Sequence, residues 1–455
     1  MPPIDKDWHS RRLAYSSLLF AVVMSCYGGL WLLWAKHYDL YIAVMSAFGV
    51  DAWRFPFLDT MGLLSWIECH QRGIDVLVTN PCDPLNRLFA YSPVMLDLPN
   101  FGLRVSDTFI IGASITLLFL ATLPLVFRPA SLDALLLACV ACLSPAVLFA
   151  VERGNFDLVE FVLIAAAGLC ALRRGAARFA SYAIFLISGF LKFYPFALLA
   201  LSVREQPRTF AAIAALSAAA ILAFGGYYWS DLLKVSAQQP PFIFWGDTFS
   251  ARQLPFGIAN YFHFSTRIGV LLMLLLLAVF GYIAFRFATL FQFVVSEPDW
   301  RRPGFYFLAV GCLLIVGCFV AGTNVGYRAI MLLFVMPGLF DLKSSDRRRW
   351  PNRILTVTLW IVLFLLWKDF FRHAVDIVFG RLDPDQANPL PADWPHLSFF
   401  VFRELAWWSV VAVFMAFIGL FLWQSPLAQA LMAAWRNHSA RDSRIADESK
   451  FGQSI

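Results

Sequence analysis

Apolar stretches long enough to cross a membrane recur along the whole chain, with short polar turns between them. A helix of about 20 predominantly apolar residues crosses a bilayer core, and these stretches reach that length or come close to it. The pattern therefore predicts an all-α polytopic integral membrane protein. The predicted spans are 14–34, 106–127, 132–151, 156–172, 208–229, 266–290, 304–322, 326–342, 354–371 and 401–424.

One further apolar stretch, 179–203, is interrupted by Lys192-Phe193-Tyr194-Pro195. Proline breaks a helix and disfavours helix at the residue before it. Arginines flank the stretch on both sides, and a single span would place one of these groups outside the cytoplasm, against the positive-inside pattern. We therefore predict two short helices that turn at Lys192. This pair brings the total to about 11–12 crossings, with both termini cytoplasmic.

The composition excludes a water-soluble globule, because 60% of the 455 residues are hydrophobic and the mean hydropathy is +0.67. Residues 1–424 are predicted to form a single membrane domain, with 35–105 as its first outer loop. Residues 425–455 are predicted to form a polar cytoplasmic tail. The net charge of +6 comes largely from short basic runs between spans, such as Arg347-Arg348-Arg349. Such runs mark cytoplasmic loops rather than a nucleic-acid-binding surface.

The first outer loop contains a predicted element of its own. Residues 60–73 place Leu64 and Ile67 on one side and predict an amphipathic helix that lies on the membrane interface. The loop also contains Cys69 and Cys82. These two cysteines can pair if the loop faces an oxidising compartment, and otherwise they stay free.

Asp59 is the first candidate for chemistry, because it follows an apolar run and precedes the predicted interfacial helix. An ionisable residue at a membrane boundary is costly and marks a functional candidate. A carboxylate there can act as a general base that deprotonates an attacking hydroxyl. The alternative is that Asp59 caps the helix that starts at Thr60. The two roles are compatible.

Two outer segments supply further candidates. Asp83, Arg87 and Tyr91 lie in a loop punctuated by prolines, which suits the wall of a site and equally suits a tight surface turn. In the turn 152–157, Arg153 offers forked hydrogen bonds to phosphate. The alternative there is an ion pair of Arg153 with Glu152 or Asp157, with Asn155 capping the next helix. The candidates in this turn are Arg153, Asn155 and Asp157.

Two later outer turns repeat the combination of a cation with a tyrosine. Lys192 and Tyr194 lie at the helix break, where a phosphate would compensate the ammonium and where Lys192 can instead extend to the lipid headgroups. Asn324, Tyr327 and Arg328 form the second turn, which also fits an ordinary interfacial anchor. The twelve-span topology places all these turns on the side opposite the cytoplasm.

The sequence contains no phosphate-binding glycine-rich loop, no zinc-ligand spacing and no serine nucleophile elbow. Nucleotide chemistry on the cytoplasmic side therefore has no support. No metal ligands are predicted and no cofactor is required, although a divalent cation can assist such a site.

Asp59 in the first outer loop, an amphipathic stretch and then Tyr91-Ser92-Pro93 before the next span resemble the GT-C class of polytopic glycosyltransferases. The pattern is most similar to the mannosyltransferase-like glycosyltransferase family 87, in which a Tyr-Pro-Pro element stands at this place. The turn at Gly154-Asn155 and the break after Lys192 are also similar. Ser92 replaces the first proline of that element. The resemblance implies a lipid-linked sugar donor, an inverting transfer and Asp59 as the base.

The sequence thus predicts a glycosyltransferase of the GT-C type, in the inner membrane of a bacterium, with its site facing the periplasm or exterior. Its partners would be a polyprenyl-phosphate donor of a mannose-like sugar and a lipid or glycan acceptor. Arg153, Lys192 and Arg328 would hold the donor phosphate. The first alternative is a transporter or flippase for lipid-linked sugars or anions, because broken helices also occur in transporters. The second is a scaffold without catalytic activity.

Overall fold

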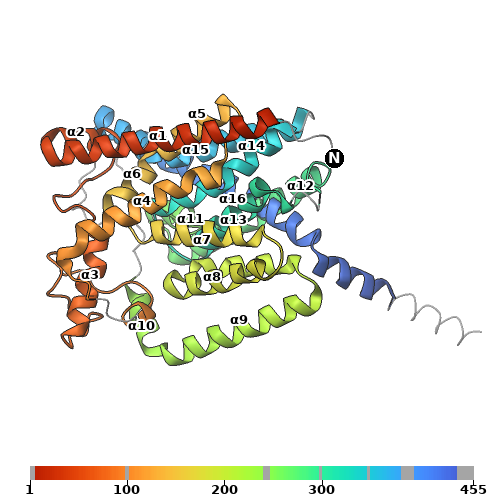
Figure 1. Cartoon of the computed structure of the whole chain (residues 1–455), viewed down its shortest axis with the longest axis horizontal. Coiled ribbons are helices and arrows are strands. Elements are labelled where there is room, and N and C mark those ends of the chain that lie inside the picture. The colour runs from red at the N-terminus through yellow and green to blue at the C-terminus, as the bar shows by residue number, and fades with distance from the viewer. Residues whose placement is uncertain are drawn as a thin grey trace, which may run out of the picture.

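The computed structural model describes residues 6–97, 102–238, 246–296, 300–345, 349–380 and 394–437. The chain is almost entirely helical. Long helices lie side by side, with α2, α3 and α10 at one end of the bundle, here called the α3 end, and the N-terminus at the other (Figure 1). The helices are α1 (Lys6–Lys36), α2 (Tyr38–Ala47), α3 (Leu58–Gln71), η1 (Pro93–Met95), η2 (Val105–Asp107), α4 (Thr108–Phe127), α5 (Leu132–Cys142), α6 (Pro145–Arg153), α7 (Asp157–Ala171), α8 (Ala176–Lys192), η3 (Tyr194–Arg204), α9 (Pro207–Tyr227), α10 (Trp229–Ala237), α11 (Gln253–Tyr261), α12 (Thr266–Phe291), α13 (Pro303–Ala321), η5 (Gly326–Phe334), α14 (Val335–Ser345), α15 (Arg349–Phe379) and α16 (Trp394–Trp423); the strands are β1 (Thr248–Phe249) and β2 (Asn324–Val325).

Within the described ranges, seven helices are long and apolar enough to cross a membrane, or eight if the bent pair α5 and α6 counts as one span. This confirms an all-α polytopic membrane protein. The other predicted crossings correspond to shorter or broken helices, namely α7, the pair α8 and η3, and the pair η5 and α14. Their number as crossings stays a prediction.

The broken stretch 179–203 forms the hairpin that its proline and flanking arginines predict. α8 ends at Lys192, and η3 runs back beside it. Near the open end of the hairpin, Arg178 lies 2.9 Å from the Glu205 carboxylate and the Tyr182 hydroxyl donates to the same carboxylate at 2.9 Å. Lys192 therefore lies at the closed end, away from Arg178.

The predicted span 132–151 is wrong as a single helix. The structure has α5 and α6 instead, bent by 49° at the break between them. The cause is Ser144-Pro145: Pro145 occupies the first turn of α6, and Ser144 before it has extended backbone angles. The bend aims the C-terminal end of α6 at the α3 end of the molecule.

The predicted interfacial helix exists as α3, but its burial by the rest of the protein was not predicted, and its place relative to the membrane stays a prediction. Polar Thr60 and Ser65 are buried along with Leu64 and Trp66. Thr60 Oγ1 donates to the Gly154 carbonyl at 2.6 Å, so the protein itself covers this helix on more than one side. The preceding helix α2 was not predicted, because it lies in the part of the predicted outer loop before residue 60.

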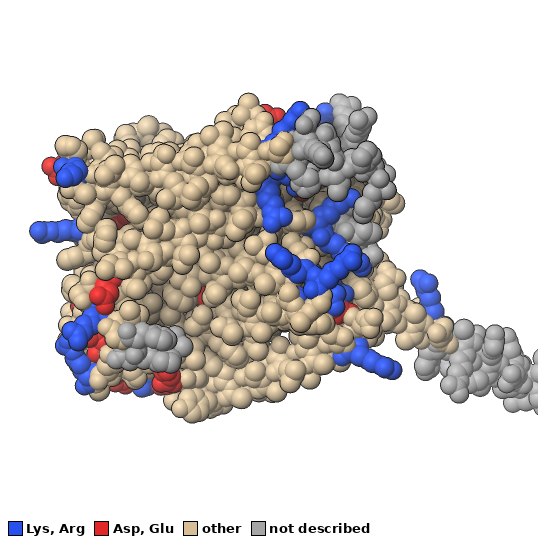
Figure 2. Space-filling model, viewed as in Figure 1, with Lys and Arg blue, Asp and Glu red and all other residues tan. Residues whose placement is uncertain are grey.

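The predicted tail begins as a helix over 426–437. The rest of the predicted tail, 438–455, and Arg347-Arg348 lie outside the described residues. Lys and Arg side chains gather at the end of the bundle away from α3 (Figure 2). This end, which carries Arg178, Arg204 and Arg301, is called the arginine end below.

The core beneath the α3 end is a stack of aromatic rings. The rings of Phe161 and Phe334 lie 4.2 Å apart between centroids, and those of Phe307 and Phe334 lie 5.6 Å apart. All three side chains are fully buried. Because stacked, buried rings resist displacement, α7, α13 and η5 are held together, and so are the polar residues at the outer ends of α7 and η5.

Candidate functional site

Asp59 lies in the first turn of α3, where each of its carboxylate oxygens has a different partner. Asn155 Nδ2 donates to Oδ2 at 2.6 Å, and Arg87 lies 3.3 Å from Oδ1. The side chain is still 17% exposed. The predicted capping role is wrong, because the residue at the N-cap position is Phe57 and no side chain caps this helix. Asp59 is therefore held in place while remaining open to a ligand.

Asn155 links Asp59 to the buried charges behind it. It stands in the turn between α6 and α7, where Gly154 has φ +55°, a conformation that glycine adopts without strain. Asn155 Oδ1 accepts hydrogen bonds from the Asp157 amide at 2.8 Å and from Lys192 Nζ at 3.2 Å. Asn155 thus donates to one charged group and accepts from another.

Asp157, at the start of α7, is the centre of a buried ion cluster. Lys192 Nζ lies 2.8 Å from Oδ1, and Arg328 Nε lies 3.5 Å from Oδ2. The Tyr194 hydroxyl also donates to Oδ1, at 2.9 Å. The Lys192 side chain is 3% exposed and that of Asp157 is fully buried. Such a cluster is tolerated only with close pairing.

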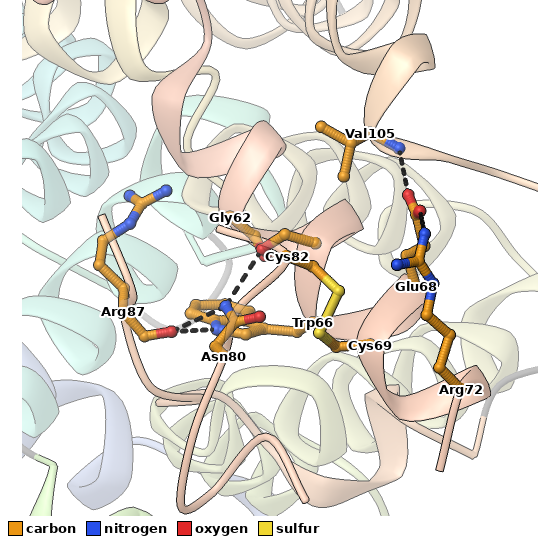
Figure 3. Close-up of a disulfide and its surroundings, with 10 residues drawn as sticks. Gly62, Trp66, Glu68, Cys69, Arg72, Asn80, Cys82, Arg87 and Val105 are labelled. Atoms are coloured by element: carbon orange, nitrogen blue, oxygen red, sulfur yellow. Dashed lines mark hydrogen bonds and ion pairs between the residues drawn. A yellow bond between two sulfur atoms is a disulfide. The ribbon is translucent and has the colours of Figure 1, made fainter. Parts of the chain in front are cut away.

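The disulfide Cys69–Cys82, which the sequence left open, is formed (Figure 3). It joins α3 to the loop that carries Asp83 and Arg87. The Arg87 carbonyl accepts from Trp66 Nε1 at 2.8 Å and from Asn80 Nδ2 at 2.9 Å, so the backbone of Arg87 is fixed against α3.

The side chain of Arg87 is fixed as well. Its Nε donates to buried Asp83 at 2.7 Å, and its Nη2 donates to the Leu58 carbonyl at 2.8 Å. Asp83 therefore orients the Arg87 side chain that contacts Asp59. The proline-punctuated loop thus lies against Asp59 and the start of α3, and its role as the wall of a site stays a prediction.

Tyr91 forms the aromatic side of the site. Lys192 Nζ lies 4.9 Å from its ring centroid and 5.9 Å from that of Tyr327, distances at which an ammonium is attracted to a ring. Burial, and then the nearby Asp59 carboxylate, raise the pKa of Tyr91 well above its usual range. Tyr91 therefore stays a neutral phenol at physiological pH.

Non-glycine residues with left-handed backbone angles stand beside three of the site's segments. Phe57 (φ 54°) precedes α3, Asn86 (φ 50°) precedes Arg87, and Phe193 (φ 59°) follows Lys192. This conformation costs free energy for a residue with a side chain and persists where the surroundings enforce it. Its concentration here is typical of a functional site.

The charges of the cluster are divided unevenly. On one side the Asp157 carboxylate contacts two cations, Lys192 and Arg328. On the other side the Arg87 guanidinium contacts two carboxylates, Asp59 and Asp83. Asn155 stands between the two halves. The buried Glu160 carboxyl group also interacts with Lys192 and Arg328, so the first half favours a further anion while Glu160 is protonated. The second half favours a hydroxyl that can give up a proton.

Arg153 and Asn324 lie apart from direct contact with Asp59. Arg153 pairs with Glu152 at 3.2 Å and lies over the rings of Trp53 and Phe149. This is the ion pair that the sequence offered as the alternative to phosphate binding. Asn324 accepts a hydrogen bond from Arg328 and donates to the carbonyls of Cys318 and Gly322, so its visible role is to orient Arg328.

A second group of buried charges was missed by the sequence analysis. Lys368 contacts Asp247 and Asp369, and nearby Arg403 pairs with Glu404 at 2.8 Å. The signal was present, because four of these five ionisable residues stand inside the predicted spans 354–371 and 401–424. Burial and the Asp369 carboxylate raise the pKa of Asp247 above its usual range.

This second group adjoins the first through the β1–β2 pair. The Gly326 amide donates to the Asp247 carbonyl at 2.8 Å, two residues before Arg328. The five residues comprise two cations and three carboxylates, and Arg372, 3.5 Å from Asp369, balances the third carboxylate. Among the described residues, no three His, Cys, Asp or Glu side chains cluster so as to hold a metal ion.

Fold and site together define a polytopic α-helical membrane protein with a polar, charge-divided site at the α3 end of its bundle. Comparisons of the chain with protein-family models, curated proteins and solved structures find no match.

Proposed function

We propose that this protein is a membrane glycosyltransferase that moves a mannose-like sugar from a polyprenyl phosphate to a hydroxyl of a lipid or glycan acceptor. We further propose a GT-C-like arrangement close to family 87, in a bacterial inner membrane with the α3 end facing the periplasm or exterior. The observation that carries the proposal is the divided charge around Asn155: a partly exposed carboxylate, Asp59, stands next to the two cations on Asp157.

Each half of the site suits one half of such a transfer. The acceptor hydroxyl gives its proton to Asp59 while its oxygen forms a bond to the anomeric carbon of the sugar. The bond between that carbon and the phosphate oxygen breaks, and the polyprenyl phosphate leaves as an anion. Lys192 and Arg328 stabilise the developing negative charge. Attack opposite the leaving group inverts the configuration of the sugar.

Asp59 retains the capacity to accept the proton. Each carboxylate oxygen has two lone-pair directions, and Asn155 and Arg87 occupy one on each oxygen. These bonds orient the carboxylate toward the exposed side. Asp83 and Asn324 then act as positioning residues, the first through Arg87 and the second through Arg328.

An apolar groove gives the lipid part of the donor a place. It has a volume of about 710 Å³ and is lined by side chains of α1, α2, α6 and the segments next to them, including Leu30, Leu33 and Phe48. Lys36 and His37 also line it, at the α3 end of α1. Groove and site share α6, since Leu148 lines the groove and Asn155 follows the same helix. We propose that the polyprenyl chain lies here.

Gly29→Phe tests the groove, because a side chain at Gly29 would enter open space in it. We expect KM for a long-chain donor to rise by about tenfold, as expected for losing contact with about two methylene groups at ~0.8 kcal/mol each. A short-chain donor should be unaffected. Gly28→Phe is the matched control, because Gly28 also faces open space but does not line the groove. Equal effects on both donors, or in both variants, would place the chain elsewhere.

The activity itself is tested with purified full-length protein in lipid vesicles, a polyprenyl-phosphate donor carrying a labelled sugar, and candidate acceptors. We expect label in the acceptor together with one released polyprenyl phosphate for each sugar transferred. Movement of intact donor between leaflets, without release of polyprenyl phosphate, would instead establish the transporter. The observation that favours a transporter is the broken helix at Lys192.

A further inference from the structure

A hollow of about 570 Å³ lies at the arginine end, on the far side of the membrane domain from Asp59. The residues before α8, the ends of η3 and α16, and the segment before α13 form its walls. The part of α8 from Arg178 to Lys192 separates the hollow from Lys192 by about 21 Å of helix. The hollow is called the arginine pocket below, and its basic and aromatic lining consists of Arg173, Arg174, Arg178, Arg204, Arg301, Trp300 and Phe421.

The pocket has an excess of positive charge among the described residues. Among the described residues, Glu205 contacts two of these arginines, at 2.9 Å from Arg178 and 3.6 Å from Arg204. That carboxylate is 3% exposed and also accepts from Tyr182, so its capacity is largely used. Arg173 and Arg174 are exposed and form no ion pair with any described residue.

Parts of the pocket are held rigidly. Arg204 donates to the Ala171 carbonyl and lies 5.0 Å from the centroid of the Tyr306 ring. Trp300 Nε1 donates to Gln424 at 2.9 Å, which fixes the opposite wall. A guanidinium held in one orientation loses little entropy when it binds a further ligand.

The residue type distinguishes this pocket from an ordinary basic loop. The positive-inside pattern calls for Lys or Arg near the ends of spans, but it does not require that all the cations be arginine or that they line a hollow. Planar guanidinium groups bind phosphate oxygens through paired hydrogen bonds. Basic pockets between helices of membrane proteins suit phosphate headgroups.

We propose that the arginine pocket binds a multiply charged phosphate group, carried either by the headgroup of an anionic lipid or by a free phosphate compound. The volume suits a small ligand or a headgroup. Phe421 and Leu172 in the same lining offer contact for the apolar part of a lipid. The pocket is independent of the transfer proposed at the α3 end.

The test uses the full-length protein with two probes, inorganic pyrophosphate in detergent and cardiolipin in phosphatidylcholine nanodiscs. Thermal unfolding and ligand titration give the stabilisation and the Kd for each. In Arg173→Gln/Arg174→Gln we expect Kd to increase at least about tenfold, because two charge-assisted hydrogen bonds are lost. Both residues are exposed, so the variant should fold as the wild type does.

Arg11→Gln/Arg353→Gln is the matched control, since it removes two exposed arginines that do not line the pocket. It should bind as the wild type does. Binding of pyrophosphate that the pocket variant weakens identifies a free phosphate as sufficient, and the same result with cardiolipin alone identifies a lipid headgroup. Absence of binding by both probes, or equal Kd in wild type and pocket variant, would overturn the proposal.

Discussion

Asp59→Asn should lower the turnover of sugar transfer by about 10²–10⁴-fold, the usual contribution of a general base. An amide has nearly the shape of the carboxylate but cannot accept the acceptor's proton. Asn155 can still donate to the remaining oxygen, and the position is partly exposed, so the fold should be retained. The measurement is kcat and KM for labelled transfer in vesicles, with the melting temperature of each variant determined alongside.

Asp39→Asn is the control for this variant, because Asp39 is an exposed carboxylate on α2, outside the charged cluster of the site. Its turnover should equal that of the wild type. Unchanged turnover in Asp59→Asn would remove Asp59 from the chemistry. A fall in turnover together with a collapse of the melting temperature would show that Asp59 supports the fold instead.

Asp157→Asn should have the largest effect on stability, about 3–5 kcal/mol, which is typical when a buried ion pair loses one partner. The substitution leaves both Lys192 and Arg328 without their shared carboxylate in a region where Lys192 is 3% exposed. The free energy of unfolding, from denaturant titration in detergent, measures the effect.

Asp75→Asn provides the matched comparison, because Asp75 and Lys234 form an ion pair at 3.2 Å with side chains about half exposed. Removing that exposed pair should cost only about 0–1 kcal/mol. The double variant Asp157→Asn/Lys192→Met should lose less stability than the two single variants together. We expect a difference of about 0.5–3 kcal/mol, because the two residues are coupled. Equal losses for Asp157→Asn and Asp75→Asn would contradict a tightly paired buried cluster.

The turns that meet at the site could be predicted because membrane topology restricts where they go. Once the stretch 179–203 is read as a hairpin, Lys192 must lie on the same side as Asp59, Asn155 and Arg328. The structure brings these four residues into one connected network. Their partners could not be predicted, since a hydropathy pattern gives the depth of a residue but not the direction of its side chain.

The features that were not predicted from the sequence have local physical causes. A hydropathy pattern does not reveal the bend between α5 and α6. The ring of Pro145 prevents a continuous helix there, so α5 ends and α6 starts in a new direction. The burial of α3 depends on Thr60 reaching Gly154, a contact between segments 94 residues apart. Lys368 lies within the predicted span 354–371 and not in an outer turn, and a charge within an apolar span is itself a signal of function.

The disulfide between Cys69 and Cys82 also bears on how the protein is made. The two cysteines are 13 residues apart, and both are synthesised before α4, which begins at Thr108. Proteins are synthesised at about 5–20 residues per second, starting from the N-terminus. The disulfide can therefore form before the later helices have been synthesised. In the proposed orientation, an oxidised loop on the far side of the membrane would oppose retraction of α1. The crosslink would thus help to fix the orientation of α1 while the later helices insert.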